Sequence, residues 1–404
     1  MTQPLEVYSL LSACCTGLVL NRITHRFFNI RQGFKFSSIF IQFLTIIIFS
    51  TFILTVLHSY ASIIFLVLLT VAVHFYSNEV TTSTDRKTEP SITLFRSYCS
   101  FLTIISILAI DFPSVYPERF GKSEKYGASV MDTGVGILVF GSGASFGLSK
   151  RNKMKISDLI TTSACLGLGV VRFISIRIFG LNETVEEYGV HWNFFLTIAV
   201  INIISNSLLR GRSSTFLSFT GVGIIFAYQI CLEKGLRDYI FNAERTTLFS
   251  KNREGILSCL GYISIFCLSA VLSRIVNSKN MLSKLLTATV IFSLAYYKLY
   301  AYELPSRRMA NLTYVSWMLS CCSYFWWLLK FLNDSCGFVS TGVPVLLEKI
   351  NNHGFGAFLV GNILTGIVNL TTNSREVGVF GAMTILFGYM AIVSLYAIFA
   401  QVLQ

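Results

Sequence analysis

The chain has 404 residues, of which 53% are hydrophobic and only 13% are charged, and this composition excludes an ordinary soluble domain. The net charge of +12 does not indicate nucleic acid as a partner, because the basic residues lie in short segments between apolar runs. Residues 36–78 contain no Asp, Glu, Lys or Arg, which is enough for two spans of about 20 residues. The apolar runs show no strand-like alternation, so we predict an all-α, polytopic membrane helical bundle.

Apolar runs recur along the whole chain and predict about thirteen transmembrane helices. The first run, 7–20, has no basic region before it and no small-residue cleavage site, so we predict a membrane helix rather than a removed signal peptide. Residues 1–404 are predicted to form a single multi-span membrane domain. The predicted helices are 5–20, 37–57, 60–76, 95–111, 129–148, 157–178, 190–208, 214–231, 255–276, 282–300, 311–331, 355–372 and 377–401.

The charges of the connecting segments predict the orientation of the bundle, because cytoplasmic loops carry an excess of Lys and Arg. The basic segments are 22–35, 150–155, 210–212 and 274–284. The alternate segments are balanced in charge, as in 111–128, or acidic, as in 183–187, and are predicted to be lumenal. The N-terminus is then lumenal and the C-terminus cytoplasmic. Asn182 begins a glycosylation sequon on the lumenal side.

Segment 111–128 concentrates charged residues at the end of an apolar run. Pro113 and Pro117 prevent a continuous helix, because each removes a backbone donor and clashes with the preceding turn. On one straight helix Asp111 and Lys122 would stand roughly 16 Å apart, whereas a chain bent at the prolines brings them toward hydrogen-bonding distance. A carboxylate beside an ammonium suits a general base and an oxyanion stabiliser for acyl transfer. The alternative is a structural ion pair that helps the loop to pack.

Four stretches of sequence stand out from the apolar background. They are DFPSVYPERFGKSEKYGASVMDTGVG at 111–136, EEYGVHWNFF at 186–195, NREG at 252–255 and GNILTGIVNL at 361–370. In content and order they resemble the motifs of the glycosylphosphatidylinositol (GPI) inositol acyltransferases, the PIG-W family. The resemblance implies a multi-pass protein of the endoplasmic reticulum membrane. It would move a fatty acyl group, palmitoyl in this expectation, from acyl-CoA to the inositol hydroxyl of glucosaminyl-phosphatidylinositol.

The resemblance also suggests roles for single residues. Asp111 is the predicted general base, and Lys122 either orients Asp111 or stabilises the tetrahedral oxyanion, in a direct transfer without an acyl-enzyme. Acyl-CoA, glucosaminyl-phosphatidylinositol and membrane lipid are the expected partners, with no tightly bound cofactor. The residues expected to bind substrate are Arg119, Tyr126, Asp132, His191, Trp192, Asn193, Arg253, Asn362 and Asn369.

Several of these substrate-binding residues have a structural alternative. His191 and Trp192 lie at the predicted lumenal interface, where aromatic anchoring is common. Asn362 and Asn369 are seven residues apart on one helical face, where they line a head-group cavity or pack against another helix. Arg253 meets a phosphate or forms a local ion pair. We expect Asp132, where the loop returns to the membrane, to support folding as much as activity.

Other devices for acyl transfer are missing from the sequence. Residues 143–147, GASFG, fit the GxSxG pattern, but a nucleophile elbow needs a strand before it, and this stretch lies in a predicted helix. We find no metal-ligand motif and expect no metal, and the cysteines in apolar runs are expected to be buried thiols. A membrane lipid transporter or flippase is the alternative function, since many spans with intramembrane polar residues suit it too. A non-catalytic scaffold subunit is the weaker alternative.

Overall fold

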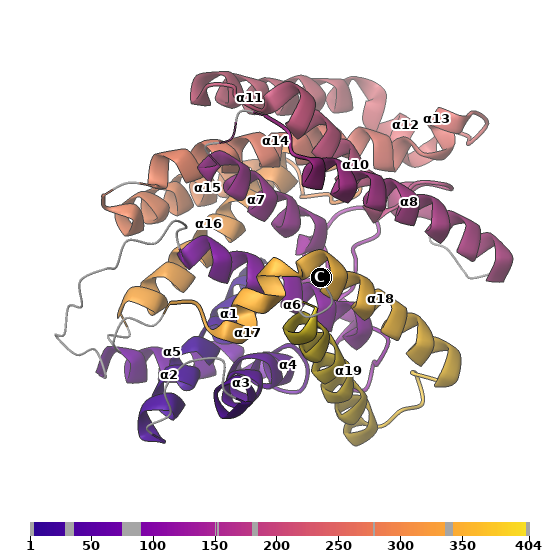
Figure 1. Cartoon of the computed structure of the whole chain (residues 1–404). Coiled ribbons are helices and arrows are strands. Elements are labelled where there is room, and N and C mark those ends of the chain that lie inside the picture. Colours follow the sequence, from indigo (N-terminus) through magenta and orange to yellow (C-terminus); the bar gives the residue numbers. More distant parts are fainter. Residues whose placement is uncertain are drawn as a thin grey trace. The chain divides into compact units, whose positions relative to one another are not determined.

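The computed structural model describes residues 4–28, 36–74, 90–149, 151, 153–179, 185–277, 279–335 and 342–400. Within these ranges all regular structure is helical (Figure 1). Nine helices of the described part of the chain are long and apolar enough to cross a membrane. These findings confirm an all-α, multi-pass membrane protein. Each predicted span overlaps an observed helix, but thirteen crossings stay a prediction, and the sequon at Asn182 lies outside the described residues.

The chain divides into two compact units, which are described separately. Unit 1 comprises residues 123–128 and 135–323, apart from Met1, and unit 2 comprises 2–122, 129–134 and 324–404. The prediction of a single membrane domain over 1–404 stays a prediction.

Unit 2 contains both ends of the described chain. Its helices are α1 (Pro4–Cys15), α2 (Gly17–Phe27), α3 (Phe36–Gln42), the π-helical turn η1 (Phe43–Ile48), α4 (Phe49–Leu54), η2 (His58–Tyr60), α5 (Ala61–His74), α6 (Pro90–Ala109), η3 (Glu118–Phe120), α17 (Val345–Asn352), α18 (Gly354–Thr371) and α19 (Val379–Phe399). Helices α17, α18 and α19 all pack against α6, which forms the centre of this group (Figure 1).

Unit 1 contains the middle of the chain. Its helices are α7 (Thr133–Leu148), α8 (Ile156–Phe179), α9 (Val185–Tyr188), α10 (Phe194–Ile204), η4 (Ser205–Leu209), α11 (Ser214–Cys231), η5 (Leu232–Leu236), α12 (Arg237–Asn242), α13 (Leu248–Lys251), α14 (Arg253–Val276), α15 (Met281–Tyr302) and the first half of α16 (Leu312–Ser335). Helix α14 is the core of this unit, and α9, α10, α11, α13 and α15 pack on it.

The glycines of GASFG have a packing role in unit 1. A Cβ atom at Gly143 would collide with Ser269 and the Phe266 carbonyl, and one at Gly147 would collide with Ser273 and the Ala270 carbonyl. Small residues four apart allow two helix backbones to approach closely, as in other membrane helix pairs. The stretch lies inside α7, as predicted, with no strand before it among the described residues. Its glycines therefore serve the contact between α7 and α14.

The N-terminal helices extend further than predicted. A break at Thr16 separates α1 from α2, and α2 continues to Phe27, so Arg22 and Arg26 belong to the helix rather than to a loop. Arg22 is buried because its guanidinium donates to the carbonyl oxygens of Leu332 and Asn333 and to the side-chain oxygen of Asn333. A cation with these partners can remain inside an apolar helix pair, so Arg22 does not bear on the orientation of the chain.

Candidate active site

Segment 111–128, which begins with Asp-Phe-Pro and is called the DFP loop below, follows the end of α6 at Ala109. Two turns follow, in which the amide of Asp111 donates to the Leu108 carbonyl at 3.1 Å and that of Tyr116 donates to the Phe112 carbonyl at 3.0 Å. The rings of Phe112, Tyr116 and Phe120 are buried and hold the loop against unit 2. The irregular segment predicted from the two prolines is confirmed. Asp111 therefore lies just after the C-terminal end of α6 rather than within the helix.

The Asp111 side chain is half-buried and contacts a helix that is distant in sequence. The amide Nδ2 of Asn369, near the end of α18, donates to Oδ2 of Asp111 at 2.9 Å. Burial raises the pKa of Asp111 above its ordinary value, while the Asn369 hydrogen bond and the positive charge of the exposed Lys122 oppose this shift. The structure thus brings Asp111, Lys122 and Asn369 together in unit 2. A partly desolvated carboxylate with one neutral donor and a nearby cation can act as a proton acceptor.

Asn369 reaches Asp111 because α18 packs closely on α6 and α19. A Cβ atom at Gly361 would lie 2.8 Å from the Tyr389 hydroxyl and 3.1 Å from the side chain of Ile104, so glycine permits this approach. The Tyr389 hydroxyl donates to the Ile104 carbonyl at 3.0 Å and so joins α19 to α6. Asn362 donates to the Phe358 carbonyl of its own helix at 2.7 Å and remains half-buried. The GNILTGIVNL motif therefore positions Asn369.

Arg119 forms an ion pair that the sequence did not indicate. Its Nη2 lies 2.8 Å from Oε1 of Glu6, in the first turn of α1, and 3.3 Å from Nδ1 of His58. Its guanidinium also lies 5.1 Å from the centre of the Phe120 ring, and its side chain is 44% exposed. Glu6 is an isolated acid beside an apolar helix, and such residues usually have a partner or a function. That isolation was the signal available in the sequence.

Asp132 forms a closed turn with Ser129. The Ser129 amide donates to Oδ2 of Asp132 at 3.0 Å, and the Asp132 amide donates to the Ser129 hydroxyl at 3.1 Å. This reciprocal pair immediately precedes Thr133, where α7 begins, and satisfies backbone donors that a helix start leaves without partners. It also explains why α7 starts four residues later than the predicted 129. The geometry favours a folding role for this buried carboxylate.

In unit 1 the EEYGVHWNFF and NREG motifs form one module. Val190 donates its amide to the Lys251 carbonyl, and the His191 amide donates to Oδ1 of Asn252, both at 2.8 Å. Gly189 has φ +115 and lies directly against Lys251 and Asn252, a conformation that favours glycine. The two motifs are about sixty residues apart in the sequence, and the structure shows that hydrogen bonds join them.

The three predicted substrate-binding residues of the EEYGVHWNFF motif have local partners. The Trp192 indole donates to the Thr197 hydroxyl at 2.9 Å, and the His191 ring packs edge-on against Phe173. Buried Asn193 caps α10 by accepting from the Leu196 amide and donates to the Gly169 carbonyl at 2.8 Å. Asn193 therefore holds α10 against α8, while His191 and Trp192 stay half-buried.

Glu254 is the centre of a buried ionic cluster at the start of α14. Its fully buried carboxylate accepts from Arg245 at 3.0 Å and from Arg308 at 2.9 Å. Arg253 donates to the carbonyl oxygens of Ile240 and Glu244 and stacks over the Tyr239 ring. Only 2% of the Arg253 side chain is exposed, so the geometry favours its local structural alternative.

Tyr126 belongs to unit 1 rather than to the Asp111 group. Its ring packs edge-on against Phe241, and the next residue, Gly127, donates its amide to the Pro305 carbonyl at 2.8 Å. Burial raises the pKa of the Tyr126 phenol, so it stays protonated at neutral pH. The predicted site residues thus fall into two groups. Unit 2 holds Asp111, Arg119, Lys122, Asp132, Asn362 and Asn369, and unit 1 holds Tyr126, His191, Trp192, Asn193 and Arg253.

Comparisons with known proteins agree with the motifs. The model of the family described as GWT1 matches residues 2–400. The chain is 33% identical over 329 residues to GPI-anchored wall transfer protein 1 of Kluyveromyces lactis, covering 76% of this chain and 72% of that protein. It is 31% identical over 361 residues to the protein of the same name from Candida albicans, covering 76% and 73%. For that of Aspergillus oryzae the identity is 34% over 358 residues, covering 76% and 71%.

Proposed function

The chain belongs to the GWT1 family, and we propose that it is an acyltransferase of GPI-anchor biosynthesis. The relatives' name, GPI-anchored wall transfer protein 1, supports the pathway. The finer proposal is transfer of a fatty acyl group, palmitoyl in the first instance, from acyl-CoA to an inositol hydroxyl of glucosaminyl-phosphatidylinositol. We place the reaction in the endoplasmic reticulum membrane, with segment 111–128 and the N-terminus in the lumen and the C-terminus in the cytoplasm.

The observation that carries this proposal is the environment of Asp111. A carboxylate whose pKa is raised by burial is a stronger base than an ordinary surface aspartate, yet the Asn369 amide and the Lys122 charge help it to remain ionised. In the proposed step, the inositol hydroxyl oxygen attacks the thioester carbonyl carbon as Asp111 accepts the hydroxyl proton. The tetrahedral oxyanion collapses, the C–S bond breaks, and the departing thiolate takes the proton from Asp111 to leave as CoA, which returns Asp111 to its ionised form. No acyl-enzyme is formed.

Lys122 has two compatible roles in the proposed reaction. Its ammonium favours the ionised form of Asp111, and it is positioned on an exposed loop where it can stabilise a developing oxyanion. We propose that exposed Asn369 and Arg119 of unit 2 contact the head group, with half-buried Asn362 on the same helix as Asn369. In unit 1, half-buried Tyr126, His191 and Trp192 are the proposed substrate-binding residues. Buried Asp132, Asn193 and Arg253 support the local backbone instead, since their polar atoms have protein partners.

The direct test is an assay of the purified protein with radiolabelled palmitoyl-CoA and glucosaminyl-phosphatidylinositol. We expect label in an ester of the glycolipid together with release of one CoA per ester formed. In reconstituted vesicles, movement of the glycolipid between leaflets with no new ester would support the transporter alternative and contradict the proposal. A non-catalytic scaffold would form no ester by itself, so the absence of labelled ester with the purified wild-type protein would support that alternative.

A further inference from the structure

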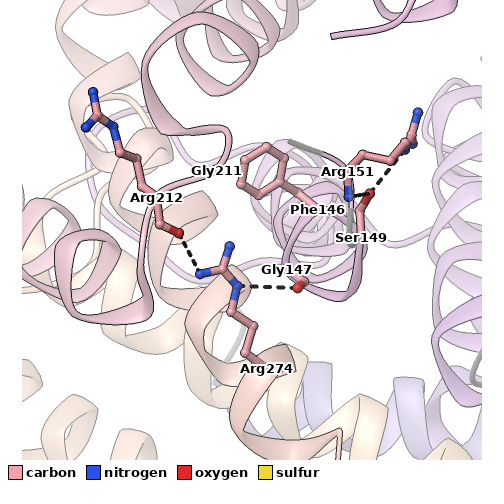
Figure 2. Close-up of a pocket in the computed structure, with 7 residues that line it drawn as sticks. All are labelled: Phe146, Gly147, Ser149, Arg151, Gly211, Arg212 and Arg274. Atoms are coloured by element: carbon pink, nitrogen blue, oxygen red, sulfur yellow. Dashed lines mark hydrogen bonds between the residues drawn. The ribbon is translucent and has the colours of Figure 1, made fainter. Parts of the chain in front are cut away.

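A pocket of about 280 Å³ lies in unit 1, and none of its lining residues belongs to the four motifs that indicated acyl transfer (Figure 2). It is formed by the end of α7, the turn before α11 and the last turn of α14. Its lining residues are Phe146, Gly147, Ser149, Arg151, Gly211, Arg212 and Arg274. Three of the seven are arginines, and none is acidic. The pocket is therefore strongly cationic.

The guanidinium groups are held in place without being neutralised. Arg274 donates Nε to the Gly147 carbonyl at 3.4 Å and Nη1 to the Arg212 carbonyl at 2.9 Å (Figure 2). Arg212 donates Nε to the Leu208 carbonyl, and Arg151 donates Nε to the Ser149 hydroxyl. Among the described residues, no carboxylate pairs with any of these three arginines. Carbonyl and hydroxyl oxygens orient a cation but leave its charge available to an anion.

The neighbouring carboxylate is already engaged. Asp158, at the start of α8, lies 3.2 Å from Nη2 of Arg210 and also accepts from the Lys155 amide. The Arg210 guanidinium lies 5.2 Å from the centre of the Phe146 ring, on the wall of the pocket. A fourth cation thus stands beside the three arginines, and the excess of positive charge remains.

The length of α14 implies that the pocket lies near a membrane surface. Helix α14 carries Glu254 at one end and Arg274, twenty positions later, at the other. This separation corresponds to a rise of about 30 Å, the thickness of a bilayer's hydrocarbon core. Phospholipid head groups occupy that level of the membrane. Basic pockets between transmembrane helices are suited to acidic head groups.

An apolar stripe on α11 leads away from the pocket. Phe216, Phe219, Val222, Phe226 and Ile230 recur on one side of this helix and are 43–76% exposed. The Arg212 guanidinium lies 5.1 Å from the centre of the Phe216 ring, so the stripe starts where the cationic pocket ends. A soluble phosphate compound would not contact this stripe. An anionic lipid would contact both features, because its head group binds cations and its chains pack on an apolar surface.

We propose that this pocket binds the phosphate of an anionic phospholipid, whose acyl chains lie along the α11 stripe. Phosphate oxygens accept from the planar guanidinium group of Arg274, which suits bidentate contacts. Arg151 and Arg212 lie on opposite sides of Arg274 and add positive charge on either side of the phosphate (Figure 2). The site is independent of the proposed acyl transfer. It would hold a structural or regulatory lipid in the leaflet opposite the Glu254 end of α14.

The test measures binding of a fluorescent phosphatidic acid to the full-length protein in detergent micelles, with phosphatidylcholine of the same chains as the reference. Phosphatidic acid should bind at least about tenfold more tightly than phosphatidylcholine, since near a membrane each cation contributes an energy worth roughly fivefold in affinity. The double variant Arg151→Gln, Arg212→Gln should lose about 30-fold in affinity for phosphatidic acid alone. It spares Arg274, which holds two backbone carbonyls.

Two control variants separate charge from folding. Arg375→Gln removes an exposed arginine of unit 2 and should leave the affinity unchanged. Arg151→Lys with Arg212→Lys keeps the charge and should retain most of the binding. Equal affinity of the wild-type protein for the two lipids would overturn the proposal, as would unchanged binding in the Gln variant. Displacement of the phosphatidic acid by equimolar CoA or inorganic phosphate would overturn it in favour of a soluble ligand.

Discussion

Asp111 and Glu254 are both acidic residues at an end of a membrane helix, but their surroundings differ. Glu254 is fully buried and accepts from the guanidinium groups of Arg245 and Arg308. Asp111 is half-buried, accepts from the neutral Asn369 amide, and has a pKa raised by burial. Two close cations bind the Glu254 carboxylate too firmly for it to receive a substrate proton. The Asp111 carboxylate, which accepts from one neutral donor, can still receive a substrate proton.

The hydrogen-bond partners of the two carboxylates, and not their exposure alone, indicate a structural role for Glu254 and a catalytic role for Asp111. A buried ion pair contributes little net stability, but breaking it leaves an uncompensated charge. A partly desolvated acid with a raised pKa is less stable in its ionised form within the fold. Replacement of Glu254 should therefore damage the fold, and replacement of Asp111 should damage only the reaction.

The largest expected effect is the loss of acyl transfer in Asp111→Asn. The amide keeps the shape of the side chain but cannot accept the hydroxyl proton, so kcat/KM should fall by about two to four orders of magnitude. The folded-state pKa of Asp111 lies above the unfolded value of about 3.9, so ionisation destabilises the fold at pH 7 and its removal should not lower the thermal unfolding midpoint. An unfolding midpoint that falls together with activity would contradict the comparison.

The opposite pattern is expected for Glu254→Gln. Arg308 and Arg245 would lose their carboxylate, which should reduce the free energy of unfolding by about 3–5 kcal/mol. Thermal unfolding of the purified protein in detergent measures this, with Glu244→Gln as the matched control because Glu244 is an exposed acid of the same unit. If Glu254→Gln folds as stably as the control and only turnover is lost, Glu254 belongs to the reaction.

A smaller effect is expected for Asn369→Ala. Its hydrogen bond favours ionised Asp111 and so lowers the pKa, which means that its removal raises the pKa further. The acidic limb of the pH profile of kcat/KM should then move to higher pH, which lowers the activity on that limb. Thr371→Ala is the control, because this exposed hydroxyl donates to the Ile367 and Val368 carbonyls of its own helix. An unmoved limb would show that Asn369 does not tune the base.

The smallest effect is expected for Asp132→Ala. Loss of the reciprocal turn with Ser129 removes a helix-capping interaction, which costs about 1 kcal/mol in typical helices. The unfolding midpoint and the activity should decline together. Normal stability with lost turnover would place Asp132 among the catalytic residues.

The membrane class could be predicted from the sequence because charge-free runs allow few other structures. Helix ends were less predictable, since they depend on local partners such as the Ser129–Asp132 turn and the contact between Arg22 and Asn333. The spacing of Asn362 and Asn369 correctly indicated a shared helical face. It contained no information that Asn369 would meet Asp111, because that contact requires α18 to pack on α6 through Gly361.

The Glu254 cluster shows a second limit of sequence reasoning. Arg245, Glu254 and Arg308 are spread over 64 residues, and none of the spacings indicates a common partner. Their meeting depends on the start of α14 lying against the segment before α16. The cluster could be recognised only once the tertiary fold was known. The GASFG stretch, by contrast, could be excluded as a nucleophile elbow from the sequence, because it lies in a predicted helix.

The most direct test of the central claim compares Asp111→Asn, Lys122→Met and the double variant in the palmitoyl-CoA assay. If the two residues act as one catalytic unit, each single variant should lose at least about two orders of magnitude, and the double variant should be hardly worse than either. If they are a structural pair, each single change leaves an uncompensated partner and the double change partly restores stability. Activity regained in the double variant would therefore contradict the assignment of Asp111 and Lys122 as the catalytic pair.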